Sequence, residues 1–194
     1  MPSYSFKKEA KVYIVSGGNQ YSIDVSAISF SQTFAQHNYS TKTLHSQSNV
    51  FEGSVINKAN KASFCFEFPA ITEADYTIVE TLLIGATSFD LYVTASDPVV
   101  DTFKLETAVI TNGTFVIEKS RPLSITIQGE ASKLTRGASL TGSAVSRTTK
   151  TYIRPILQVT LGSNDLSYVA ATTMELQNEI TWTPYTTLQN SLSA

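Results

Sequence analysis

Two histidines in one polar segment are the residues of this chain that come nearest to a metal site. His37 and His45 lie in the same region as Glu52. Structural zinc sites, however, combine Cys and His at short, regular spacings, and these spacings are irregular. The single cysteine, Cys65, alternates with phenylalanines, which indicates a small strand side chain rather than a nucleophile, and it excludes an internal disulfide. We therefore expect no metal site and two ordinary polar histidines.

Motifs for nucleophilic or phosphate chemistry are incomplete. A serine hydrolase needs an activated serine beside a histidine, and the chain has no Gly-x-Ser-x-Gly elbow. The stretch from Gly137 to Gly142 has the glycine spacing of a phosphate-binding loop but lacks the lysine that reaches the phosphates. Glu67 and Glu80 are isolated carboxylates, not a pair flanking a cleft. The sequence therefore predicts a protein that is not an enzyme and binds no cofactor.

The composition is that of a β-rich protein with few charges. The 194 residues fit one domain, and 42% of them are hydrophobic, which is enough for a sizeable core. Only 15% are charged, against about 25% in a typical soluble domain, and Ser and Thr are abundant instead. Such a surface suits burial against other subunits or, more simply, Thr-rich strands. The net charge of −2 disfavours duplex DNA binding through a cationic face.

The sequence shows no sign of a membrane anchor or an export signal. No run approaches the about 18 apolar residues of a membrane span. No apolar segment follows the charges near the N-terminus, so we expect no signal peptide, synthesis in a cytoplasm and no membrane partner.

Alternating apolar residues predict strands along most of the chain. Two strands flank residues 16–19, where Gly17-Gly18 allows a tight hairpin turn. A further strand is expected at 27–36, and an aromatic strand ends at Pro69. Asn112-Gly113 predicts another hairpin turn between two strands.

One helix interrupts the strands. Thr72 has the residue type of an N-cap, Asp75 follows three residues later as in a capping box, and Ile71 and Tyr76 occupy the staple positions. Gly85 ends the pattern. We therefore expect a helix over about 72–84, whose apolar stripe lies on a sheet and consists of Ile78, Val79, Leu82 and Leu83.

Two polar segments and a C-terminal extension complete the chain. Residues 37–49 have no helical period and predict a long loop or an exposed hairpin. Residues 132–151 are basic, rich in Ser and Thr, and contain no acid. They suit a flexible loop, an arm that orders on a neighbouring subunit, or a phosphate contact. Additional strands are expected over 152–183.

The order of these elements resembles the tail tube proteins of tailed bacteriophages, a fold shared with type VI secretion tubes and baseplate tube-initiator proteins. The resemblance covers roughly residues 11–130. It implies a single mainly β domain over 1–194, a two-sheet β-sandwich or barrel of tail-tube type with one flanking helix at about 72–84 and extended loops. The basic segment 132–151 and the strands after Tyr152 depart from the simplest pattern. The matching segments are Val12–Val25, Ala27–Gln36, His37–Asn49, Phe51–Ser54, Ser63–Phe68 and Thr72–Ile84.

The resemblance also implies a function. In that family six copies form a ring, and stacked rings make a tube through which DNA is ejected. The expected partners are further copies of the chain, the tape-measure protein, baseplate or terminator proteins, a sheath, and DNA in transit without sequence-specific binding. The expected location is the virion tail, assembled in the host cytoplasm. The sequence leaves open a contractile or non-contractile tail, and a major tube subunit or an end ring.

Candidate site residues follow from this interpretation. Ser29, Ser31 and Thr33 lie on the polar side of one predicted strand and are the candidates for the wet lumen. Candidate subunit contacts lie in or directly after the first polar segment and in the second, and they are Tyr39, Lys42, Leu44, His45, Phe51, Lys133, Arg136, Arg147 and Lys150.

Two other function classes are weighed against the tube. A β-sandwich binding module, such as an adhesin or a carbohydrate-binding domain of a virion or cell surface, would use exposed aromatic rings, whereas most phenylalanines here alternate into the expected core. An enzyme would need His37 and His45 in a site whose other members the sequence does not supply.

Overall fold

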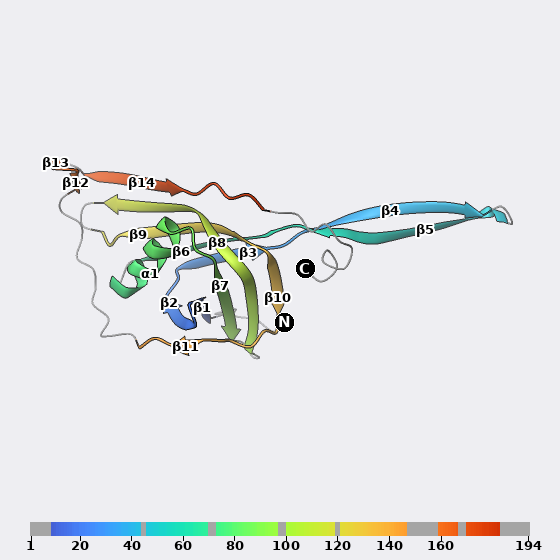
Figure 1. Cartoon of the computed structure of the whole chain (residues 1–194), viewed down its shortest axis with the longest axis horizontal. Coiled ribbons are helices and arrows are strands. Elements are labelled where there is room, and N and C mark those ends of the chain that lie inside the picture. The colour runs from blue at the N-terminus through green and yellow to red at the C-terminus, as the bar shows by residue number, and fades with distance from the viewer. Residues whose placement is uncertain are drawn as a thin grey trace, which may run out of the picture.

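The computed structural model describes residues 9–43, 46–69, 73–96, 100–118, 121–146, 159–166 and 170–182 (Figure 1). Strands dominate this part of the chain, and one helix interrupts them. In chain order the elements are β1 (Glu9–Ser16), β2 (Asn19–Ile23), β3 (Ala27–Ser31), β4 (Phe34–Thr43), β5 (Ser46–Ala59), β6 (Ala62–Pro69), α1 (Glu73–Ile84), β7 (Phe89–Ser96), β8 (Val100–Glu118), β9 (Ser124–Ala131), β10 (Lys133–Arg136), β11 (Ser143–Ala144), β12 (Val159–Leu161), β13 (Asn164–Leu166) and β14 (Ala171–Gln177).

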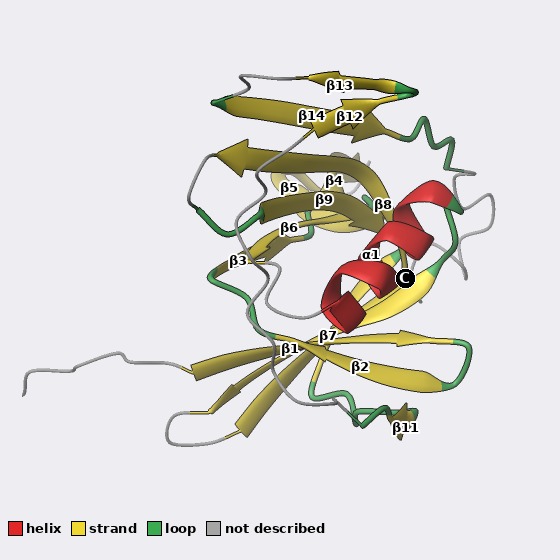
Figure 2. Ribbon diagram, turned by 90° about the vertical axis from the view of Figure 1, so that its left-hand side faces the viewer, coloured by secondary structure: helices red, strands yellow, loops and turns green. Residues whose placement is uncertain are grey.

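The strands form two layers that share the long strand β8 (Figure 2). The upper sheet contains β14, the C-terminal part of β8, β9, β6 and β3. The lower sheet contains β2, β1, β7 and the N-terminal part of β8, with β10 and β11 added. β8 passes between the layers near Thr107, which has a φ of 50° and whose N–H donates to Asp90 Oδ1 at 3.1 Å. The mainly β, two-layer fold with one helix is confirmed, and the sheet stays open rather than closing into a barrel.

The core lies between the layers and under the helix. Along β6 and β9 buried and accessible residues alternate, as the period of two in a strand requires. Phenylalanines from β6 pack as a row, with Phe64 and Phe66 stacked at 6.1 Å between ring centroids. Leu82 and Leu83 of α1 are buried against this core, so the apolar stripe of the helix lies on the sheet as predicted.

The helix ends as a tight turn. Gly85 N–H donates to Thr81 O at 3.0 Å, and Thr87 N–H donates to Leu82 O at 3.3 Å. The left-handed position belongs to Ala86, with φ 45°, and not to the glycine. A side chain at Gly85 would meet Thr81 O at 2.9 Å, so close packing explains this glycine. The predicted N-cap Thr72 and the predicted staple residue Ile71 lie outside the described residues.

The first polar segment is a hairpin, the second of the two predicted alternatives. β4 and β5 pair over nearly their whole length and extend well beyond 37–49. The hairpin projects from one end of the molecule, away from both sheets (Figure 1).

The strand expected over 27–36 is divided in two, because Gln32 turns out of the ladder. Its side chain donates to Asn60 O at 2.8 Å and accepts from Leu134 N–H at 3.0 Å.

The hairpin turn predicted at Asn112-Gly113 is wrong. Both residues lie inside β8, beside a register shift between Ile110 and Asn112. Gly113 instead serves close packing, because a Cβ there would lie 2.5 Å from Leu83 Cδ2 of the helix. A local Asn-Gly signal is thus overridden by the approach of α1 to the sheet.

The segment 132–151 differs from the arm or loop predicted, as far as it is described. Residues 133–136 form β10 on β8, and residues 143–144 pair with β2 as β11. Residues 147–150 lie outside the described part. Within the predicted C-terminal region, β12 and β13 form a small hairpin and β14 extends the upper sheet beside β8.

Candidate functional site

The two faces of the upper sheet have different chemistry. One face packs on the core and the helix. The other, here named the polar sheet face, presents hydroxyl, amide and carboxylate groups in rows across the strands. The ladder registers place on it Ser29, Ser31, Ser63, Cys65, Glu67, Asn112, Thr114, Thr126, Gln128, Glu130, Glu175 and Gln177.

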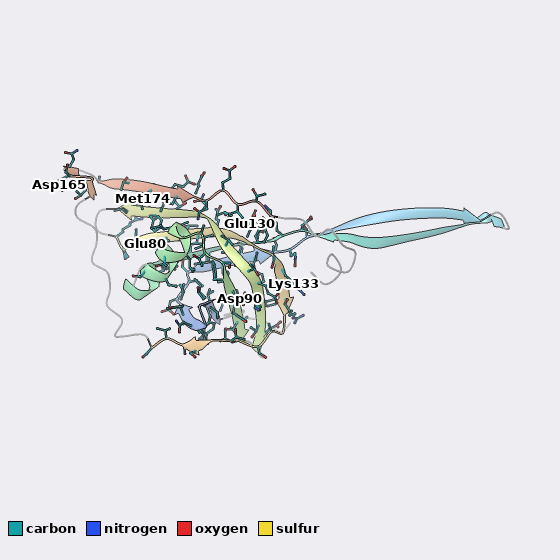
Figure 3. All side chains as sticks on the ribbon, viewed as in Figure 1. Glu80, Asp90, Glu130, Lys133, Asp165 and Met174 are labelled. Atoms are coloured by element: carbon teal, nitrogen blue, oxygen red, sulfur yellow. The ribbon has the colours of Figure 1, made fainter. Side chains whose placement is uncertain are left out.

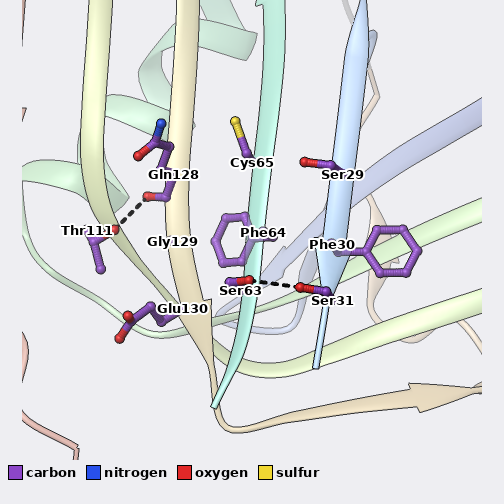
Figure 4. A pocket seen from close by; sticks show the side chains of 10 residues that line it. All are labelled: Ser29, Phe30, Ser31, Ser63, Phe64, Cys65, Thr111, Gln128, Gly129 and Glu130. Atoms are coloured by element: carbon purple, nitrogen blue, oxygen red, sulfur yellow. Dashed lines mark hydrogen bonds between the residues drawn. The ribbon is translucent and has the colours of Figure 1, made fainter. Parts of the chain in front are cut away.

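A hollow of about 410 Å³ lies on this face, over β3, β6 and β9 (Figure 4). Ser29 and Ser31 line one side, and Gln128 and Glu130 line the other. Ser31 Oγ and Ser63 Oγ are hydrogen-bonded at 3.2 Å across the hollow, while Thr111 Oγ1 donates to Gln128 O at 3.2 Å. The hydroxyls of Ser31 and Ser63 therefore form one hydrogen bond with each other and keep capacity for more. The polar groups that line the hollow suit contact with water.

The structure brings two of the three predicted lumen residues together. Ser29 and Ser31 are exposed and lie two positions apart on β3, opposite Cys65 and Ser63 of β6. Thr33 is exposed too but lies beyond β3, at the base of the hairpin, where its Oγ1 accepts from Asn60 Nδ2 at 3.0 Å. The role of these residues as a lumen surface stays a prediction.

Sequence reasoning missed other members of the polar sheet face. The sequence pattern predicts a turn at Asn112, and it gives no connection of Cys65 or Glu130 with Ser29. The alternation of Ser124, Thr126 and Gln128 was the available signal. It could not reveal that β9 lies beside β6 and β8, because strand neighbours are a long-range property.

The carboxylates of the polar sheet face are held by neutral and basic partners. Asn112 Nδ2 donates to Glu175 Oε1 at 2.7 Å and Gln177 Nε2 donates to the same oxygen at 3.3 Å, which lowers the pKa of Glu175. Glu130 accepts from Trp182 Nε1 at 2.7 Å and forms a salt bridge with Lys61. The face therefore carries carboxylates, and the ammonium group of Lys61 is paired with one of them, Glu130.

The upper sheet ends in two strands whose outer edges have no partner among the described residues. β3 pairs with β6 on one side, and β14 pairs with β8 on one side. Unpaired edges are sites where a further strand can add. The chain after β14 is anchored by Asn178, whose Nδ2 donates to Leu83 O at 2.7 Å and to Ile110 O at 3.1 Å.

Of the predicted contacts in the hairpin, three are placed. Tyr39 and Lys42 lie on β4, and Phe51 lies on β5 opposite Thr41. Leu44 and His45 lie outside the described residues. The backbone of the hairpin thus places these three residues away from the two sheets. Their role as subunit contacts stays a prediction.

Of the predicted basic contacts, two are placed. Lys133 and Arg136 lie at the two ends of β10. Arg136 Nη2 lies 2.7 Å from Asp101 Oδ2, and the hydrogen bond and the charge of Asp101 raise the pKa of the guanidinium. Arg147 and Lys150 lie outside the described residues.

Two classes of feature are not found in the described part of the chain. No group of three or more His, Cys, Asp or Glu side chains there is arranged to hold a metal ion. None of the helical residues described forms a helix long and apolar enough to cross a membrane.

Comparison with known proteins gives a partial family match and a shared fold. Residues 2–83 match the model of the Bacteriophage Baseplate Tube Protein Family. A chain in the cryo-EM structure of the anti-feeding prophage baseplate is similar at 14% identity, with 70% of this chain and 97% of that chain covered and a TM-score of 0.51. A chain in the PVC sheath/tube terminator structure is similar at 10% identity, covering 71% and 98%, with a TM-score of 0.47. No curated protein sequence matches this chain significantly.

At this level of identity the structural likeness establishes the fold, and the family model adds a sequence match over β1 to α1. The two findings agree with the element order of the chain. The resemblance predicted from the sequence is therefore confirmed: this chain has the tube-type fold of the phage tail tube and baseplate tube family.

Proposed function

We propose that this protein is a structural subunit of a phage-like tail, in which six copies close into a ring and the polar sheet face lines the central channel. The rings stack into or onto a tube that conducts DNA during ejection. Other tail proteins, such as a tape-measure protein, a sheath, and baseplate or terminator rings, are its neighbours in the virion tail, which assembles in the host cytoplasm.

The observation that carries this proposal is the form of the upper sheet. It has one face that packs on the core, with only its β14 end exposed at Met174 and Leu176, and one polar face that is open. Its end strands β3 and β14 each have an outer edge that pairs with no strand among the described residues. Closing a ring by joining β3 of one copy to β14 of the next would remove both edges. Repetition of one heterologous contact generates a closed ring when its rotation closes.

The charges of the polar sheet face support the same role. Proteins that hold nucleic acid neutralise phosphates with clustered Lys and Arg. Here the face carries hydroxyls, amides and carboxylates, and Lys61 at its border is paired with Glu130. A channel lined in this way would repel phosphates weakly and would let DNA pass without holding it.

Cysteine labelling of the assembled protein tests the lumen assignment. Ser31→Cys lies on the polar sheet face, and Lys11→Cys lies on β1 of the lower sheet; both positions are exposed in the monomer. Both variants are made in a Cys65→Ser background. Electron microscopy over a concentration series should show six-fold rings or tubes. In the assembled state, Ser31→Cys should react with a bulky maleimide at least tenfold more slowly than Lys11→Cys.

Three results would overturn the proposal. Equal labelling of the two cysteines in assembled rings would show that the polar sheet face does not line the channel. Rings that lack six-fold symmetry would contradict the proposed hexamer. Monomers that persist at all concentrations and that bind glycans would favour the binding-module alternative.

A further inference from the structure

We infer that residues 133–145, here named the edge strap, cover both edges of the lower sheet and thereby restrict strand addition between copies to the upper sheet. The surface that the edge strap keeps closed is the edge of β2, and a strand of a second copy is the partner that would add there without it. This role rests on the proposed function in one respect only, namely that β3 and β14 are the edges that join.

The first end of the edge strap covers the lower-sheet edge of β8. β10 pairs with β8 from Lys133 to Arg136 (Figure 3), and Gly137 N–H prolongs the pairing by donating to Thr102 O at 2.7 Å. Arg136 Nη2 also lies 2.7 Å from Asp101 Oδ2. Because β7 occupies the other side of β8, this stretch of β8 has a strand on both sides.

Between its ends the edge strap crosses the outer face of the lower sheet. Thr141 Oγ1 and Tyr92 Oη of β7 are hydrogen-bonded at 3.0 Å. Gly142 comes close to β1, because a Cβ there would lie 3.2 Å from Val15 Cγ1, and its φ of 89° favours glycine. The edge strap therefore passes over β7 and β1 on its way to the opposite edge of the sheet.

The second end of the edge strap covers the edge of β2. β1 occupies one side of β2, and β11 pairs in parallel with the other side, so that β11 lies beyond β2 and away from α1 (Figure 2). Ser143 N–H donates to Gly18 O at 2.9 Å, and Val145 N–H donates to Gln20 O at 3.0 Å. These bonds occupy backbone groups that would otherwise be open to an added strand.

The edge strap contributes little to the core, which indicates that its role is at the edges. Residues 137–146 are exposed or half-buried, and none of them belongs to the buried core. Ordering such a segment costs conformational entropy with little burial of apolar area to offset it. The outer edges of β3 and β14 in the upper sheet, by contrast, have no partner among the described residues. A molecule with open edges on both sheets would add copies in more than one direction, whereas this arrangement leaves one.

Proline substitution in β11 tests this role. Val145→Pro removes the N–H that donates to Gln20 O. The matched control is Ala144→Pro, because the N–H of Ala144, between two donors to β2, points away from β2 in a parallel ladder. Sedimentation velocity, with electron microscopy to identify rings, measures the share of protein that is neither monomer nor ring. We expect Val145→Pro to raise this share at least about fivefold and Ala144→Pro to change it by less than about twofold.

A block on the edge of β2 locates the new contact. Gln20 O points to β11, so the alternation along β2 directs the backbone groups of Ser22 to the same edge. Ser22→Pro removes a donor that an added strand would need, so combining it with Val145→Pro should return the share to within about twofold of the unaltered protein.

A second variant loosens the edge strap without removing a backbone donor. Gly142→Ala would bring a Cβ to 3.2 Å from Val15 Cγ1 at a φ that disfavours alanine. It should raise the same share, and circular dichroism should show that both this variant and Val145→Pro keep their strands, because the edge strap lies outside the core.

The outcomes separate this role of the edge strap from the proposed function. Unchanged association of Val145→Pro and Gly142→Ala, or association that Ser22→Pro does not suppress, would overturn the inference. Association of Val145→Pro through β2, beside an unaltered protein that forms no rings, would support the inference and overturn the proposed function. Regular rings from both proteins, with no other species, would support the proposed function and overturn the inference.

Discussion

The two faces of the upper sheet share the same strands and the same ladder hydrogen bonds, yet they present different side chains. Phe64, Phe66 and Phe68 are buried on one face, while Ser63 and Glu67 on the same strand are exposed on the other. The core face determines which strands lie together, since burial of apolar area is the main stabilising contribution. The polar sheet face buries little apolar area, so its side chains are available for the assembly role proposed above. Four predictions test this division, from the largest expected effect to the smallest.

Phe66→Ala should show most clearly that the core face contributes more to stability than the polar sheet face. The ring is 1% exposed and lies between Phe64 and Phe68, so its removal leaves a cavity and should lower the free energy of unfolding by about 3–5 kcal/mol. Urea denaturation measures the effect. The control, Ser63→Ala on the same strand, should change it by less than about 0.5 kcal/mol. Comparable losses for both would show that the polar sheet face is also structural.

Gly129→Ala should show how tightly the core face is filled. A Cβ at this position would collide with the ring of Phe64 and would lie 2.5 Å from Val109 O, so overpacking should cost about 1–3 kcal/mol. Thermal unfolding measures the loss. Gln128→Ala, one residue earlier and exposed, is the control and should unfold close to the unaltered protein. An unchanged melting temperature for Gly129→Ala would mean that Phe64 can move aside.

Asn178→Ala should test how β14 is held to the sheet. The amide of Asn178 donates to two carbonyls, Leu83 O and Ile110 O, and its loss removes both of these hydrogen bonds at a total cost of about 1–3 kcal/mol. Hydrogen exchange should then become faster in β14 than in β9. Gln177→Ala, the preceding exposed position, should leave exchange in β14 nearly unchanged. Unaltered protection in Asn178→Ala would place the anchor of β14 elsewhere.

Asn112→Ala should have the smallest effect, confined to the polar sheet face. The pKa of Glu175 is lowered below its usual 4.5 first by the hydrogen bond from Asn112 and then by that from Gln177. The associated stabilisation is present above pH 4.5 and is lost as the pH falls through the folded pKa. In an NMR titration, Asn112→Ala should raise the pKa toward 4.5 more than Gln177→Ala does. A pKa that does not move would mean that the amide does not hold this carboxylate.

Much of the local structure followed from the sequence. The period of two in the apolar residues predicted the strands, and Gly17-Gly18, both with positive φ, predicted the turn between β1 and β2. The boundary signals around residues 72–85 predicted the helix to within one residue. The alternation at Ser29 and Ser31 also predicted which side of β3 is exposed. These features depend on neighbours in the chain, and such neighbours can be compared directly in a sequence.

The tertiary structure alone decided the rest. It placed Asn112-Gly113 inside β8 and not in a turn, because α1 approaches the sheet at that point. It also made β8 common to both layers, set β14 beside it, and carried the β4–β5 hairpin away from the body. Each of these depends on contacts between segments distant in sequence, and the period of a strand states only which residues share a face. It does not state which strand lies alongside, so the members of the polar sheet face are defined only by the strand pairing in the tertiary structure.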